Sequence, residues 1–166
     1  MFVTRRATLD DCQLIRSLAE IAFPHTYREL LSPEQIDFMM NWMYSLESIR
    51  EQMQQKGHIY LIAYKDGEVA GYASTWKQAE HLFHLEKLYL LPQFQKDHGG
   101  GFLFREIIRL VKSIHPEPCT IQLNVNRYNV NAVSFYEHMG MHKADQGDFH
   151  IGNGYYMTDY IMEMDV

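Results

Sequence analysis

A glycine-rich segment holds the residues most suited to chemistry. Residues 88–101 read LYLLPQFQKDHGGG: a strand-like stretch leads through a loop to three glycines, and a helical pattern follows. Free N–H groups at a helix start lie at the positive end of its dipole and bind phosphate, and glycine lets a phosphate approach the backbone. The glycines alone favour an ordinary helix start with a flexible lead-in. No Gly-Lys-Ser/Thr follows, so this is not a P-loop, and the spacing is not a dinucleotide-binding motif.

A second segment combines polar groups with an aromatic helix. Residues 123–141 read LNVNRYNVNAVSFYEHMGM, a strand-like stretch followed by Asn129 and by a helix that ends at Gly140. Asn129 is suited to cap this helix, and Tyr136 carries a phenol that can donate a proton. Tyrosine at an apolar helix position is also common in hydrophobic cores. By itself the segment therefore indicates only an asparagine-capped helix.

Taken together, in this order and at this separation, the two segments resemble the GNAT superfamily of N-acetyltransferases. The acetyl-CoA-binding motif of that family is Gln or Arg, two residues, Gly, one residue, then Gly or Ala. Gln95, His98 and Gly100 occupy these places, so a histidine replaces the first glycine. Pro92 and Leu103 lie at the expected distances before and after, which supports this register without an insertion. The matches to the family's later motif are Asn129, Ala132, Phe135, Tyr136, Glu137 and Gly140.

The resemblance implies an α/β fold with a mixed, mainly antiparallel sheet flanked by helices. The sheet is expected to splay between the strand that ends at Leu91 and the strand that ends at Asn126, and acetyl-CoA, the co-substrate, is expected to enter this V-shaped opening. The expected cofactor contacts are Leu88, Tyr89, Leu90, Gln95, Lys96, Asp97, His98, Gly99, Gly100, Gly101, Asn129 and Tyr136.

Amide transfer requires a base, an oxyanion site and an acid. An amine with a pKa of about 10.4 must lose a proton before it attacks. By resemblance Glu86 lies near the reaction centre and is the candidate base, directly or through water; the alternative is a glutamate that faces solvent or pairs with Lys87 or another neighbour. Backbone N–H groups from Leu88 to Leu90 are candidates to stabilise the oxyanion. Tyr136 is the candidate donor to the departing thiolate, and Asn129 is expected to bind the pantetheine arm, to cap its helix, or both.

The elements that position these residues follow from periodicity and capping signals. Expected strands cover residues 2–6, 58–64, 68–76, 81–91 and 120–126, with a last hairpin turning at 152–154. Expected helices run from Thr8 to Pro24, from Ser32 to about Tyr44, from Ser45 to Gly57, from the glycines to His115, and over 130–139. Ser32 is expected to cap the second helix, and Gln35 to complete a capping box with it. This order predicts an antiparallel meander, not a doubly wound sheet.

Length and composition narrow the class of protein. The 166 residues fit one domain, which is expected to span residues 1–166. Neither a bilayer-spanning apolar run nor a signal peptide is evident, so we expect a cytoplasmic protein. The net charge of −6 comes without a basic stripe, which argues against nucleic-acid binding. Cys12 and Cys119 are expected to be reduced thiols. No metal site is expected, because His81 and His84 face opposite sides of a strand.

The sequence therefore predicts transfer of an acetyl group from acetyl-CoA to a primary amine by direct attack in a ternary complex. Neither cysteine lies in the motifs, so no acyl-enzyme intermediate is expected. The alternative is an acyl-CoA-binding sensor without turnover, to which His98 gives weight. Carboxylates and aromatic residues between Phe23 and Lys56 suit a small, polyamine-like acceptor, although most of them are expected to form a solvated helix face. An amino sugar, an amino acid or a protein N-terminus is the other acceptor candidate, and a homodimer is a candidate assembly.

Overall fold

Seven strands form one sheet in the computed structural model, which describes residues 1–166. The strand order is β1-β2-β3-β4-β5-β7-β6, and every neighbouring pair is antiparallel except β4–β5. The strands are β1 (Phe2–Arg6), β2 (Ile59–Lys65), β3 (Glu68–Ala79), β4 (Leu82–Leu90), β5 (Thr120–Asn126), β6 (His142–Gly152) and β7 (Tyr155–Asp165). The predicted α/β class is confirmed, and the meander is β2–β3–β4.

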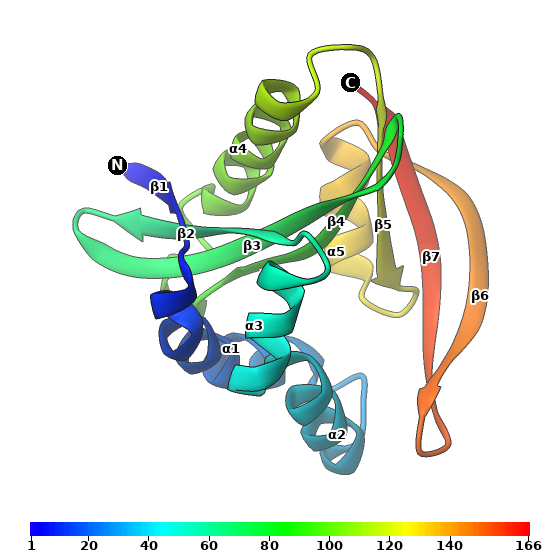
Figure 1. The fold of residues 1–166 in the computed structure, drawn as a ribbon. Helices are drawn as coiled ribbons and strands as arrows, with labels where there is room; N and C mark the ends of the chain where they lie inside the picture. Colours follow the sequence, from blue (N-terminus) through cyan, green and yellow to red (C-terminus); the bar gives the residue numbers. More distant parts are fainter.

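Helices cover both faces of the sheet (Figure 1). α1 (Cys12–Tyr27), α2 (Pro33–Tyr44) and α3 (Leu46–Gln54) lie together on one face, while α4 (Gly99–Ile114) packs against β1, β3 and β4 on the other. α5 (Val130–His138) follows β5 and packs against it. None of the helices is both long enough and apolar enough to cross a membrane.

Side-chain caps begin the N-terminal helices where serine and threonine predict them. Thr8 forms a reciprocal capping box with Asp11 around a short 3-10 turn, η1 (Leu9–Asp11), and α1 follows directly. The Ser32 hydroxyl accepts a hydrogen bond from the N–H of Gln35, as predicted. The other half of the predicted box is wrong, because the Gln35 side chain donates instead to the carbonyl of Tyr156, 2.8 Å away. This bond ties α2 to the β6–β7 hairpin.

The prediction that the first helix ends at Pro24 is also wrong, since α1 continues to Tyr27. Proline removes one helical N–H donor, but the packing of its neighbours holds the last turn. Phe23 is buried, and its ring centroid lies 4.6 Å from that of Tyr27 and 5.8 Å from that of Tyr44. The added turn carries Tyr27 to the sheet, where its hydroxyl lies 3.1 Å from that of Tyr89.

The central strands β4 and β5 are paired only at one end. Residues Leu82–His84 pair with Thr120–Gln122, and beyond them the two strands separate. β5 remains paired with β7 along its whole length, and β4 remains paired with β3 as far as Leu90. The splay implied by the resemblance is therefore present. It leaves one backbone edge of β4 without a strand neighbour from Leu85 onward.

Candidate active site

Three adjoining cavities lie along the gap between β4 and β5. The outer cavity, of about 460 Å³, reaches the start of α4 at Gly100. The central cavity, of about 130 Å³, lies between residues 85–90 of β4 and residues 123–125 of β5. The far cavity, of about 450 Å³, is enclosed by α1, α2 and the β6–β7 hairpin. The central cavity shares lining residues with both others, so ligands entering from opposite sides can meet there.

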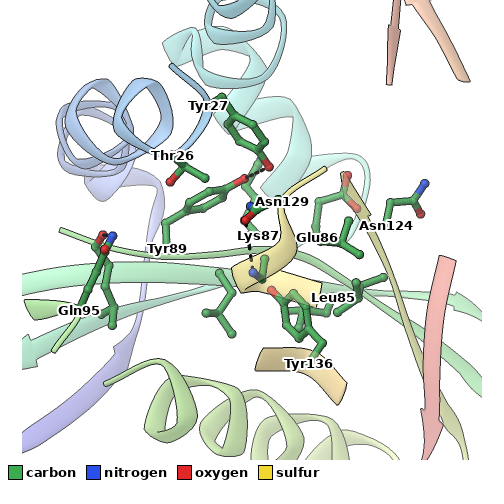
Figure 2. Close-up of a pocket in the computed structure, with 15 residues that line it drawn as sticks. Thr26, Tyr27, Leu85, Glu86, Lys87, Tyr89, Gln95, Asn124, Asn129 and Tyr136 are labelled. Carbon is green, nitrogen blue, oxygen red and sulfur yellow. Dashed lines mark hydrogen bonds between the residues drawn. The ribbon is translucent and has the colours of Figure 1, made fainter. Parts of the chain in front are cut away.

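The junction of the central and far cavities has a mixed aromatic and polar lining. The residues that line both are Tyr27, Glu86, Lys87, Tyr89 and Asn124. Figure 2 shows Tyr27 and Tyr89 joined through their hydroxyl groups on one side of the central cavity, with Glu86 and Asn124 toward the other. Leu88, Tyr89 and Leu90 line the central cavity along the unpaired edge of β4. Backbone N–H groups on such an edge are free to bind a ligand oxygen.

Glu86 lies at the junction because β4 has a bulge there. Leu85 pairs with Thr75 and Lys87 pairs with Ser74, which leaves Glu86 as the extra residue between them. Its Oε2 accepts a hydrogen bond from Trp76 Nε1 at 3.0 Å and lies 3.3 Å from His84 Nε2. Its Oε1 has no protein partner, and the side chain is one-third exposed. The carboxylate is thus held in place with one oxygen available to a ligand.

Tyr136 lies across the central cavity from β4. Its ring packs against Phe104 and Phe135 of α4 and α5, and the residue lines the outer and central cavities. Figure 2 shows the phenol projecting from α5 into the space beneath β4. Burial raises the pKa of the phenol above its usual range, so the hydroxyl keeps its proton at neutral pH and can donate it. The Tyr136 ring thus packs in the core, and the residue also lines two cavities.

Asn129 and Gln95 line the outer and central cavities from opposite sides. The Asn129 Oδ1 accepts a hydrogen bond from the N–H of Ala132 at 3.2 Å, as the capping interpretation predicts. Its amide nitrogen remains free to bind a ligand. Gln95 Nε2 donates to the carbonyl of Leu90 at 3.2 Å, which holds the loop against the end of β4.

The glycine-rich loop presents only some of its predicted residues to the cavities. His98 precedes α4 with φ +60°, a left-handed conformation that glycine adopts at lower cost, which explains the glycine of the family motif at this place. Gly100 lines the outer cavity. Gly99 is buried, and a Cβ added there would lie 2.6 Å from the Phe2 ring. Gly101 faces the Arg105 side chain. Lys96 and Asp97 are exposed, and Asp97 pairs with Lys65 at 2.6 Å.

Comparison with known proteins identifies the family. A model described as an acetyltransferase (GNAT) domain matches residues 28–164. The chain belongs to the GNAT acetyltransferase family. It is an acetyl-CoA-dependent N-acetyltransferase, and its fold is one that binds coenzyme A.

Several proteins resemble this GNAT enzyme over nearly their whole length. An uncharacterised N-acetyltransferase of Mycobacterium tuberculosis is 25% identical over 93% of this chain and 97% of its own. PaiA N-acetyltransferase from Thermoplasma acidophilum, solved with coenzyme A, has a TM-score of 0.83 at 22% identity and covers 100% of this chain and 99% of its own. A spermidine N-acetyltransferase chimera of Vibrio cholerae SpeG and hSSAT has a TM-score of 0.70 at 15% identity and covers 98% and 94%.

Lys87 is a buried residue of this enzyme that sequence reasoning missed. Glu86 does not pair with Lys87, whose Nζ donates to Gln52 Oε1 at 2.6 Å and to the Tyr60 hydroxyl at 2.5 Å. Glu86 instead contacts the neighbours Trp76 and His84, as the other part of that alternative predicts. Burial lowers the pKa of Lys87 to about 7, although the nearby Glu86 charge opposes this. Lys87 lies two residues after the buried Leu85, so strand alternation places both on the same face of the sheet. This spacing is the sequence signal that indicates the burial of Lys87.

His81 lies beside His115 and not beside His84. His81 Nδ1 lies 3.0 Å from His115 Nε2, at the end of α4. Glu117 lies beside them, and the possible metal-ligating atoms of the three residues all lie within 4.8 Å of one another. These residues lie beside the paired end of β4 and β5 and line none of the three cavities. They are separate from the candidate active site.

Replacement of Lys87 by methionine should change how stability depends on pH. In the unfolded chain lysine has a pKa of about 10.4, so between pH 7 and that value the unfolded state binds the extra proton and wild-type stability rises with pH. Methionine removes this contribution. From pH 7 to pH 9 the free energy of unfolding of the wild type should therefore rise by about 2–3 kcal/mol relative to Lys87→Met, at 1.36 kcal/mol per pH unit.

Urea unfolding at pH 7, 8 and 9 measures this difference. Lys77→Met, at a lysine of β3 with an exposed side chain, is the matched control and should follow the wild type. If Lys87→Met and the wild type run parallel across this range, the Lys87 amine is charged in the folded protein and the assignment is wrong.

Proposed function

We propose that this enzyme acetylates a small, polyamine-like amine by direct attack on acetyl-CoA in a ternary complex. The observation that carries the proposal is the central cavity, which adjoins one cavity at the start of α4 and another beneath α1 and α2. A cofactor and an acceptor can thus enter from opposite sides and meet at Glu86. No covalent enzyme intermediate is needed, and both cysteines are buried away from these cavities.

The cofactor is proposed to run from the outer cavity into the central one. The first turn of α4 at Gly100 offers free N–H groups to the pyrophosphate. The free amide nitrogen of Asn129 is positioned along the path of the pantetheine arm. The thioester carbonyl then lies against the unpaired edge of β4, where an N–H group between Leu88 and Leu90 stabilises the developing oxyanion.

In the proposed reaction the ammonium nitrogen loses two protons and the thiolate gains one. The Oε1 of Glu86 removes the first proton, directly or through water, and the nitrogen lone pair forms a C–N bond to the carbonyl carbon. The nitrogen then loses its second proton to water, the C–S bond breaks, and the electron pair leaves with the thiolate of coenzyme A. The Tyr136 hydroxyl donates a proton or a hydrogen bond to that sulfur. The position of Tyr136 in the lining of the outer and central cavities supports this role.

The far cavity supports a small amine as the acceptor. Tyr27, Trp42 and Tyr44 line it, and aromatic faces attract cations. The helix carboxylates considered in the sequence are all exposed and none lines this cavity; they are Glu29, Glu34, Asp37, Glu47 and Glu51. The preference for a cation therefore depends on carboxylates of the sheet.

Release of free thiol from acetyl-CoA across a panel of amines tests the function. Polyamines and alkyl diamines should give the highest rates, and amino sugars, amino acids and a peptide with a free N-terminus the lowest. Highest activity on the peptide would contradict the small-amine acceptor. Binding of acetyl-CoA without thiol release for any amine would instead indicate a sensor.

Replacing Gly100 by leucine should weaken acetyl-CoA binding by about 10-fold or more. A Cβ at Gly100 already lies 3.3 Å from the Phe135 ring, so a larger side chain must extend into the outer cavity and displace the pyrophosphate. Gly101→Leu is the matched control, because its side chain faces Arg105 outside the cavities. Isothermal titration of both variants checks this; equal affinities would show that the pyrophosphate binds elsewhere.

Tyr136→Phe should lower kcat by about 10²-fold while KM for acetyl-CoA changes little. The substitution keeps the ring and its packing and removes only the hydroxyl, whose interaction strengthens in the transition state. Tyr128→Phe, at an exposed tyrosine just before the same helix, is the control. An unchanged rate of the chemical step in single-turnover experiments would remove Tyr136 from the mechanism.

A further inference from the structure

Asp159 is a buried carboxylate with one oxygen unused by the protein. It lies on β7 opposite Asn126 of β5, and the residue is only 1% exposed. Its Oδ2 accepts a hydrogen bond from Asn124 Nδ2 at 3.2 Å. Its Oδ1 is fully buried and has no hydrogen-bond partner. A buried carboxylate normally has all its lone pairs satisfied, so this oxygen requires an explanation.

No protein cation neutralises this carboxylate. The charge of Arg127 acts on Asp159, but its guanidinium donates to the carbonyl groups of Gly147 and Asp159 and to the Asp148 carboxylate. Burial raises the pKa of Asp159 to about 6, and the Asn124 hydrogen bond and the Arg127 charge oppose the rise. A cation beside the carboxylate favours its ionised form. A buried charge without a partner is costly, and a cation from outside can remove that cost.

Asp159 forms part of the wall of the far cavity, so a cation bound in the cavity lies next to this residue. Asp159 lines this cavity from β7, and Glu86 lines it from β4. The two differ in position, because Glu86 also lines the central cavity, whereas Asp159 does not. The two basic side chains in the lining do not compete: burial lowers the pKa of His84, which leaves it neutral, and Lys87 is directed to Gln52 and Tyr60. The cavity thus has one carboxylate at the reaction centre and another set back from it.

We propose that Asp159 binds a second ammonium group of the acceptor, away from the amine that is acetylated. This rests on the proposed function. The Oδ1 accepts a charge-assisted hydrogen bond from that ammonium, while Asn124 holds Oδ2 in position. The carbon chain of the acceptor lies along the aromatic side chains between the two carboxylates, and its other amine reaches Glu86. The acceptor class is therefore a linear diamine or polyamine, and Asp159 is a specificity-determining residue.

The test compares a linear diamine with the monoamine of the same carbon chain, each assayed by thiol release from acetyl-CoA. The wild type should have a kcat/KM for the diamine about 10- to 100-fold higher than for the monoamine, the range of a hydrogen bond to a charged group. Asp159→Asn should abolish this preference through a higher KM for the diamine and leave the monoamine rate unchanged. A merely structural role would lower both rates together.

Asp165→Asn is the matched control, because it removes an exposed carboxylate from the same strand, and it should keep the preference. Asp159→Ser provides a second variant with a smaller polar side chain if the asparagine variant fails to fold. Equal kcat/KM values for the two amines in the wild type, or a preference that persists in a folded Asp159 variant, would overturn the assignment. No thiol release with either amine would overturn the proposed function and the role of Asp159 with it.

Discussion

The site depends on the incomplete pairing of β4 and β5. Each strand is held on its outer side, β4 by β3 and β5 by β7, so the separation of the two costs the sheet only the hydrogen bonds between them. Backbone groups left free on a strand edge must find water or a ligand. The gap therefore creates a cavity whose wall already carries oriented N–H groups. The starts of α4 and α5 lie beside the same gap, at Gly100 and Asn129, and provide further donors.

An aromatic cluster lines the junction of the central and far cavities. The Tyr27 and Tyr89 hydroxyls meet at 3.1 Å, and the Tyr72 hydroxyl donates to that of Tyr44 at 2.7 Å. These bonds satisfy polar groups within a layer of buried rings, which joins α1 and α2 to the central strands. On its far side Lys87 fills a polar pocket against Tyr60. Packing that stabilises the fold thus also positions the bulge residue Glu86, which lines both the central and the far cavity.

Local sequence patterns predicted most elements, including the loop that leads into α4. Alternating strands, serine and threonine caps and the Asn129 helix are encoded within a few residues, and they lie where the sequence indicates. The errors arose where distant packing decides the outcome. Burial of Phe23 carries α1 past Pro24, and β7 draws the Gln35 side chain away from its cap. Strand alternation with Leu85 indicates the burial of Lys87 but not its partners, and Asp159 could not be recognised from sequence alone, because these contacts come from other strands and helices.

Amide hydrogen exchange with and without coenzyme A tests most directly whether the unpaired edge of β4 receives the cofactor. Binding in the gap should slow exchange at amides between Leu85 and Leu90, at the first turn of α4 and near Asn129, because cofactor oxygens then accept bonds from N–H groups that otherwise meet water. Amides in the β6–β7 turn near Asn153 should exchange as before. Saturating coenzyme A that leaves β4 unprotected, or protects a surface elsewhere, would contradict the assignment of the gap as the cofactor site.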